Sequence, residues 1–297
     1  MRTLSSRIIV AVGGLAALAG GCGSEPNPAP ERIAFASQIG NDFQIYVSEA
    51  DGSNPVALTA TAGGNTNPDW SPDGTRIAFS TGRDGNNEVY VMSGNGGDPV
   101  NLSSNAANDF SPSWSPDGDL IAFSSFRDGN HEIYSMRIDG TDQVRLTDSP
   151  AIDFEPDWSP GGNKIAFVSD RDGDGGYEIY VMNSDGTAQV RLTSSTGDDF
   201  RPDWSPDGQR IAFQSSRDGF LDLYVMNADG ANTTRLTTTP PDQFLFVGTP
   251  VWSADGTRIA YERGGRINVM NVNGTGNVAL PAVGSVEIDP SWLPALP

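Results

Sequence analysis

The chain has 297 residues, 37% of them hydrophobic, which is enough for one large core or two small ones. Its formal net charge of −20 argues against nucleic acid and anionic membrane surfaces as partners, because both repel a polyanion. It contains one cysteine and one histidine, which excludes an internal disulfide and a zinc site with the usual number of ligands.

The first predicted element is an export signal. Arg2 and Arg7 precede an apolar stretch over residues 8–18, which is too short to span a membrane and has the length of a signal-peptide core. Small residues then lead into Cys22, the only cysteine of the chain. This pattern resembles the bacterial lipobox, in which a peptidase cuts before the cysteine and the thiol is acylated, although Leu18 lies one residue further from the cysteine than usual.

We therefore predict a lipoprotein signal peptide over residues 1–21, lipidation of Cys22 and a flexible, proline-containing tether over 22–31. The protein would be exported and anchored to a membrane, facing the periplasm or the cell surface. The alternative is an ordinary secretory signal in which the cysteine is incidental.

The remainder, residues 32–297, repeats one phrase. A turn of the form Trp-Ser-Pro-Asp-Gly followed by Ile-Ala-Phe occurs in five full or nearly full copies, and a truncated copy closes the chain. All six tryptophans occupy this one position, 40 to 48 residues apart: Trp70, Trp114, Trp158, Trp204, Trp252 and Trp292. A period of this length with strand-like content predicts a propeller or a linear array.

Each repeat is predicted to contain four strands. The first ends at the tryptophan, the Ser-Pro-Asp-Gly turn follows, and Ile-Ala-Phe begins the second. A loop, Arg-Asp-Gly in four copies (residues 83–85, 127–129, 171–173 and 217–219), leads to a third strand that is apolar on both faces, as in 178–183. A second turn leads to a short, more polar outer strand ending in Arg-Leu-Thr in three copies.

The two ends of this region are complementary halves of one repeat. Residues 32–37 match a second strand that lacks a first, and residues 286–293 match a first strand that lacks a second. Joined, they complete one blade, so we predict an all-β fold, a six-bladed β-propeller closed by pairing of the N- and C-terminal strands. The alternative is a linear solenoid, which would need a capping unit at each end.

The phrase Trp-Ser-Pro-Asp-Gly followed by Ile-Ala-Phe resembles the repeat of the TolB-like, or WD-like, propeller family over roughly residues 32–293. The resemblance is specific for fold and weakly specific for function. It implies a monomeric, protein-binding scaffold of the cell envelope whose partner is an envelope protein. TolB itself is soluble and carries an additional α/β domain; with about ten residues between Cys22 and the first strand, we expect a lipoprotein form without that domain.

Catalysis by a histidine-dependent nucleophile is not expected, and we assign no catalytic residue. The only histidine, His131, occupies a position filled by Asn87 and Leu221 in other repeats. The enzymatic alternative is a carbohydrate hydrolase or lyase that uses channel carboxylates alone.

A calcium site is a second alternative, which would make the protein a calcium-stabilised structural lipoprotein. Asp170, Asp172 and Asp174 alternate ahead of Gly175 as in a calcium loop, and Glu178 is the nearest substitute for the final glutamate ligand. The competing interpretation is a longer copy of the Arg-Asp-Gly loop with two inserted residues.

Binding is expected at the channel mouth, where loops enter the innermost strands. The position three before the proline of each repeat is acidic in four of six copies: Asn65, Asp109, Asp153, Asp199, Val247 and Glu287. Phenylalanines follow three of these acids, at Phe110, Phe154 and Phe200. A ring of such acids would attract a cation or a basic or extended segment of a partner. Alternatively, the aspartates cap the loop backbone and the phenylalanines pack between blades. The Arg-Asp-Gly arginines are predicted to form structural salt bridges between blades and not to contact a ligand.

Overall fold

The structure is a computed structural model that describes residues 31–173, 175–240, 242 and 245–294. The predicted signal peptide, Cys22 and nearly all of the tether lie outside the described residues, as does Asp174. The unit Glu31–Pro297 is described by itself. Its described residues form strands and no helix, so none of them supplies a helix able to cross a membrane.

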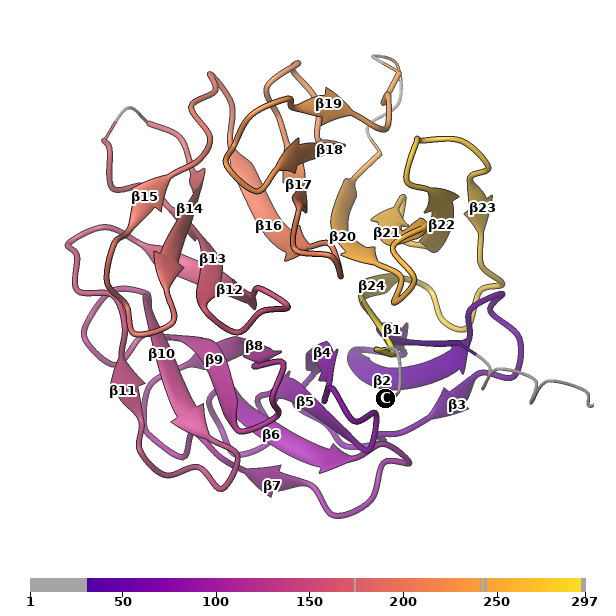
Figure 1. Ribbon diagram of the computed structural model, residues 1–297. Coiled ribbons are helices and arrows are strands. Elements are labelled where there is room, and N and C mark those ends of the chain that lie inside the picture. Colours follow the sequence, from indigo (N-terminus) through magenta and orange to yellow (C-terminus); the bar gives the residue numbers. More distant parts are fainter. Residues whose placement is uncertain (1–30, 174, 241, 243–244, 295–297) are drawn as a thin grey trace, which may run out of the picture. The chain divides into compact units, whose positions relative to one another are not determined.

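The strands form six four-stranded antiparallel sheets, the blades, arranged around an axis (Figure 1). From the inside outward, blade 1 contains β24 (Glu287–Trp292), β1 (Arg32–Ile39), β2 (Asp42–Glu49) and β3 (Val56–Ala57). Blade 2 contains β4 (Asn65–Trp70), β5 (Arg76–Thr81), β6 (Glu88–Ser93) and β7 (Val100–Asn101). Blade 3 contains β8 (Asp109–Trp114), β9 (Leu120–Ser125), β10 (Glu132–Arg137) and β11 (Val144–Arg145).

Blades 4 to 6 repeat this order. Blade 4 contains β12 (Asp153–Trp158), β13 (Lys164–Ser169), β14 (Glu178–Asn183) and β15 (Val190–Arg191). Blade 5 contains β16 (Asp199–Trp204), β17 (Arg210–Ser215), β18 (Asp222–Asn227) and β19 (Thr234–Arg235). Blade 6 contains β20 (Val247–Trp252), β21 (Arg258–Arg263), β22 (Ile267–Asn271) and β23 (Val278–Ala279).

The ends of the repeat region pair as the sequence predicts. β24 is the innermost strand of blade 1 and pairs antiparallel with β1, with Ile33 opposite Trp292 and Ser37 opposite Glu287. The prediction of a six-bladed propeller closed by its terminal strands is therefore confirmed. The solenoid alternative is wrong, because β24 contacts both of the innermost strands beside it, β4 and β20.

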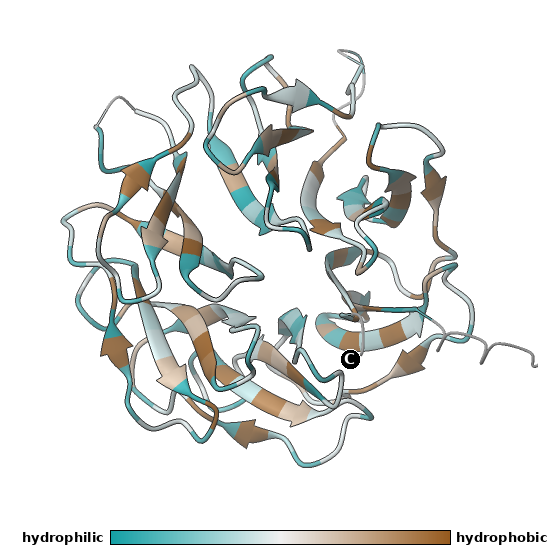
Figure 2. Cartoon of the chain, in the orientation of Figure 1, coloured by the Kyte–Doolittle hydropathy of each residue, from teal (hydrophilic) through white to brown (hydrophobic). Residues whose placement is uncertain are grey.

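The apolar core lies between neighbouring blades, which is why the middle strands are apolar on both faces (Figure 2). Trp70 and Phe79 of blade 2, for example, pack in one cluster with Ile45 and Val47 of blade 1. The second strands carry an aromatic ring at one shared position that is wholly buried in five blades: Phe79, Phe123, Phe167, Phe213 and Tyr261. Each large side chain buried in this way contributes about 1.5–3 kcal/mol to folding.

Candidate functional site

The structure corrects the predicted placement of the acids that begin the innermost strands. Asp109, Asp153 and Asp199 do not form an exposed ring, because their side chains are fully buried. Each carboxylate pairs with the arginine of the Arg-Asp-Gly loop in its own blade: Arg127 to Asp109 at 3.1 Å, Arg171 to Asp153 at 2.7 Å and Arg217 to Asp199 at 2.9 Å.

The other members of this predicted ring are also internal. Asn65 accepts a hydrogen bond from Arg83 at 2.9 Å, and Glu287 accepts the backbone N–H of Val283 at 2.5 Å. Val247 and Glu287 begin the two innermost strands whose blades lack an Arg-Asp-Gly loop, and in the other four blades the loop arginine contacts an aspartate or, in blade 2, Asn65.

These arginines act within blades, not between them as predicted. Each guanidinium also stacks over a tyrosine of the third strand, 4.4–4.9 Å from the ring centre, in the pairs Arg83–Tyr90, Arg127–Tyr134, Arg171–Tyr180 and Arg217–Tyr224. Charge pairing and stacking together hold the loop onto its sheet.

The acids of the predicted calcium loop that the structure describes have protein partners. Glu178 is buried and accepts hydrogen bonds from Arg191 at 2.7 Å and Thr193 at 2.6 Å, and Asp172 pairs with the same arginine at 2.6 Å. Asp170 accepts the backbone N–H of Ile152 at 2.8 Å.

Blade 3 repeats this clamp with Asp128, Glu132, Arg145 and Thr147, in a loop without the inserted residues. An arginine therefore supplies the positive charge near these acids in both blades. Among the described residues, which omit Asp174, no group of three or more His, Cys, Asp and Glu side chains could hold a metal ion.

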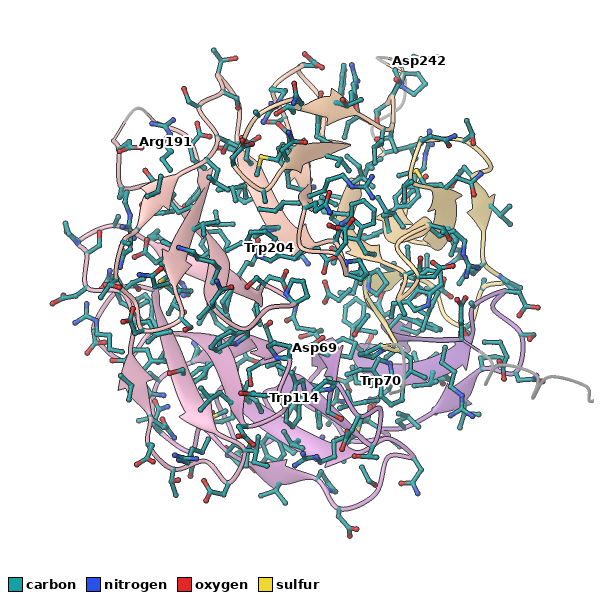
Figure 3. All side chains as sticks on the ribbon, in the orientation of Figure 1. Asp69, Trp70, Trp114, Arg191, Trp204 and Asp242 are labelled. Atoms are coloured by element: carbon teal, nitrogen blue, oxygen red, sulfur yellow. The ribbon has the colours of Figure 1, made fainter. Side chains whose placement is uncertain are left out.

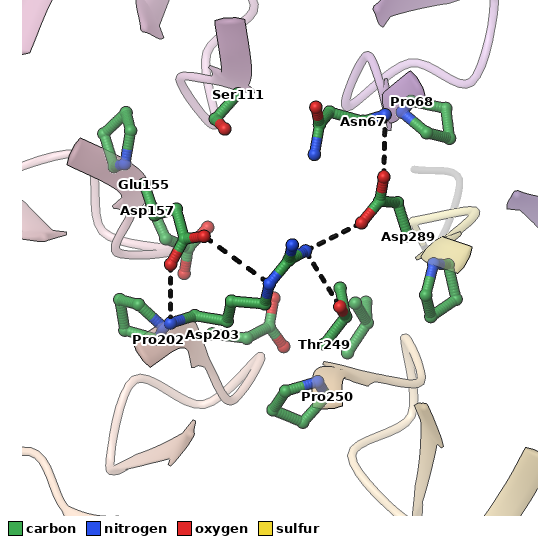
Figure 4. A pocket seen from close by; sticks show the side chains of 14 residues that line it. Asn67, Pro68, Ser111, Glu155, Asp157, Pro202, Asp203, Thr249, Pro250 and Asp289 are labelled. Carbon is green, nitrogen blue, oxygen red and sulfur yellow. Dashed lines mark hydrogen bonds and ion pairs between the residues drawn. The ribbon is translucent and has the colours of Figure 1, made fainter. Parts of the chain in front are cut away.

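The axis is lined by residues that sequence analysis did not single out. Directly before the proline of each innermost strand lies a residue with φ between 48° and 53°: Asn67, Ser111, Glu155, Arg201, Thr249 and Asp289. The cause is a β-bulge. In blade 4, Phe154 pairs with Val168 but Asp157 with Ala166, so the bulge interrupts the usual alternation of side chains. These six residues surround a pocket of about 110 Å³ (Figure 4).

Arg201 ties opposite sides of this pocket together. It donates to Asp289 at 2.7 Å and to Thr249 at 2.9 Å, and its Nε lies 3.5 Å from Glu155 (Figure 4). Burial raises the pKa of Glu155, and burial followed by the charge of Asp289 raises the pKa of Glu262 to about 7. The positive charge of Arg201 therefore acts on three carboxyl groups, those of Glu155, Asp289 and Glu262.

Further along the axis, aspartates join neighbouring blades. Asp69 accepts the backbone N–H of Trp114 at 2.8 Å, Asp157 that of Trp204 at 2.8 Å, and Asp203 that of Trp252 at 2.7 Å; Figure 3 labels the first of these pairs. At the equivalent position of two other blades a serine takes the place of the aspartate: Ser113 accepts the backbone N–H of Trp158, and Ser291 accepts that of Trp70. Burial raises the pKa of Asp69 to about 7 and that of Asp157 to about 8.

At the end of the axis where the innermost strands begin, six rings form a continuous group that we call the aromatic arc: Phe110, Phe126, His131, Phe154, Tyr177 and Phe200. It includes the three phenylalanines singled out by the sequence. Phe154 is central, with ring centres 5.4 Å from Tyr177, 6.2 Å from Phe200 and 6.4 Å from His131. Phe126 is 44% exposed and the other five are half-buried, so the arc packs across blades 3 to 5 and still presents a surface.

His131 is part of this packing. Burial among the rings lowers its pKa, and its Nδ1 has no hydrogen-bond partner among the described residues. The imidazole contacts Phe110, Phe126 and Phe154, so His131 joins the rings of blade 3 to that of blade 4.

Comparison with known proteins identifies relatives of the whole fold. The family described as TolB beta propeller domain matches residues 15–109, 100–176 and 173–295. The crystal structure of TolB from Acinetobacter baumannii is 26% identical, with a TM-score of 0.78, covering 89% of this chain and 67% of that one. The structure of putative TolB from Agrobacterium tumefaciens is 23% identical, with a TM-score of 0.69, covering 85% of this chain and 88% of that one.

A chain in the crystal structure of the nidogen/laminin complex is 11% identical, with a TM-score of 0.72. The match covers 89% of this chain and 98% of that one and shows a shared fold alone. No curated protein sequence matches the chain.

Proposed function

Since the chain belongs to the TolB β-propeller domain family, we propose that it is an exported lipoprotein whose propeller binds an envelope protein through the aromatic arc. The observation that carries this proposal is the arc itself. Six rings from blades 3 to 5 meet at one end of the axis and remain partly exposed. Aromatic side chains are enriched in protein interfaces and in the few residues that dominate binding energy.

The carboxylates that lie along the propeller axis are already bound by other groups of the protein, which favours a scaffold over a carbohydrate hydrolase or lyase. Glu155 and Asp289 are bound by Arg201, and three aspartates accept backbone N–H groups of the next blade. Groups held in this way stabilise the ring of blades and are poorly placed to exchange protons with a substrate.

Binding through the arc can be tested by capturing partners from an envelope extract with the full chain. We expect Phe126→Ala and Phe154→Ala to reduce recovery of the captured protein at least about ten-fold, since an aromatic hot spot contributes 2 kcal/mol or more. Val278→Ala is the matched control, because Val278 is 61% exposed on the outer strand of blade 6. Equal recovery with all three variants, at unchanged unfolding midpoints, would refute the proposal.

Lipid anchoring rests on the sequence of residues 1–22 and has its own test. Cys22→Ala removes the only thiol of the chain, so labelled fatty acid should no longer be incorporated and the protein should leave the membrane fraction. Radiolabelling followed by fractionation measures both effects. A variant that stays in the membrane fraction, or wild-type protein that takes up no label, would contradict the lipoprotein assignment.

A further inference from the structure

We propose that a hollow between blades 1 and 2 binds the C-terminal residue of a partner peptide, when that residue has a free carboxylate and an aliphatic side chain. The site is separate from the aromatic arc and does not rest on the proposed function. It lies at the other end of the axis, where the innermost strands end and the carbonyl oxygen of Arg32 accepts the backbone N–H of Leu293 at 2.9 Å. The hollow has a volume of about 330 Å³, which lies within the range of small-ligand sites.

The positive charge of the hollow comes from Arg32. Four blades begin their second strand with an arginine, and in three of them the guanidinium stacks over the tryptophan of the next blade. These pairs, 4.5–4.9 Å apart, are Arg76–Trp114, Arg210–Trp252 and Arg258–Trp292. Arg258 also binds the carboxylate of Glu31, so an arginine at this position can receive an acid. Arg32 is exposed and lines the hollow, and among the described residues its guanidinium has no ring, ion pair or hydrogen bond. It is therefore available to an acid from a partner.

The hollow exists because blade 2 has a glycine directly after its third strand. At this position Ile138 of blade 3 and Val272 of blade 6 pack against the core clusters between blades. Gly94 of blade 2 leaves that space open and lines the hollow. A Cβ at Gly94 would lie 2.9 Å from the ring of Trp70, so blade 2 cannot fill the space from this position without moving the tryptophan. The protein thus provides room for an aliphatic side chain and does not supply one.

The remaining lining residues determine which group fits. Val47, Val56 and Leu58 of blade 1 form an apolar wall, which an aliphatic side chain would cover. Glu49 also lines the hollow, lies opposite Arg32 in the pairing of β1 with β2, and forms no ion pair among the described residues. A C-terminal residue matches all three features: its carboxylate binds the guanidinium, its backbone N–H donates to the glutamate, and its side chain covers the wall. An internal residue of a peptide lacks the carboxylate, and an acidic side chain lacks the apolar surface.

Capped dipeptides test the inference without knowledge of the partner. The full chain is titrated with acetyl-Gly-Leu as the free acid and as the C-terminal amide, and the amide shifts of Gly94 and Asn95 are followed by NMR. The solution contains enough NaCl to reduce the screening length to about 8 Å, which weakens the general repulsion between an anion and a chain of net charge −20. We expect the free acid to bind at least about ten-fold more tightly than the amide, because only the acid makes a charge-assisted contact. Acetyl-Gly-Ala as the free acid should bind about five-fold more weakly than the leucine peptide, since it covers less of the apolar wall.

Two pairs of variants test the two halves of the site. Arg32→Met should remove the preference for the free acid, whereas Arg76→Met, at the same strand position but stacked over Trp114, should keep it. Val56→Asp should abolish binding of the leucine peptide, whereas Val100→Asp should not. Val100 is the matched control because it begins the outer strand of blade 2 as Val56 begins that of blade 1, and the two are 55% and 56% exposed. Unfolding midpoints show that each variant is folded. Equal binding of the acid and the amide, or equal loss with both members of either pair, would overturn the inference.

Discussion

Replacing Arg201 by methionine is expected to lower the free energy of unfolding by about 3–5 kcal/mol at pH 7.5, because it leaves buried carboxyls without their counterion. Arg201 is bound to Asp289, Thr249 and Glu155, and its charge acts on Glu262. It thereby links blade 5 to blades 4 and 6 and to β24, the strand that closes the ring. Urea denaturation of the two proteins measures the difference.

The control for this prediction is Arg137→Met. Arg137 pairs with Asp142 at 2.8 Å where both side chains are more than half exposed, so its loss should change stability by less than about 1 kcal/mol. The penalty of Arg201→Met should also shrink at pH 4.5, where more of the axial carboxyls are protonated. Similar losses for the two variants at pH 7.5 would show that the axial ion pairs contribute no more than a surface pair.

Asp157→Asn is expected to stabilise the protein, and the gain should grow with pH. Burial raises the pKa of Asp157 from 3.8 to about 8, so the folded protein holds this proton more tightly than the unfolded chain. The stability that the raised pKa contributes is fully present below pH 4 and is lost as the pH rises through 8. Asparagine stays neutral and its oxygen can still accept the N–H of Trp204. We expect a gain on the order of 2 kcal/mol at pH 8.5 and none at pH 4.

Asp117→Asn is a control in which the effect on stability should have the opposite sign. Hydrogen bonds from the Ser115 hydroxyl and the Asp119 N–H lower the pKa of Asp117, so its contribution is present above its unfolded pKa and lost as the pH falls. This variant should be less stable than wild type at pH 7, and the difference should shrink as the pH falls below 3.8. Urea denaturation of both variants and wild type at several pH values measures these effects. A change in stability by Asp157→Asn that does not depend on pH would refute the raised pKa.

The aromatic arc was only partly visible in the sequence. Phe110, Phe154 and Phe200 share one position of the repeat, so the periodicity brought them to one end of the axis. Their neighbours Phe126, His131 and Tyr177 come from the loops before the third strands, where the repeats differ. Packing of blades 3 to 5 brings the two sets together, and no spacing along the chain encodes it.

The sequence by itself determined the number of blades, the four strands of each and the closure by complementary ends, because these depend on local turns and on a period that can be counted. Only the tertiary structure decided which side chains face the axis. A bulge before each proline places Glu155, Arg201 and Asp289 there, while Asp109, Asp153 and Asp199 pair with arginines 18 residues further along the chain. Which side chains face the axis depends on contacts between strands and loops, and the alternation of residues along a single strand cannot reveal these contacts.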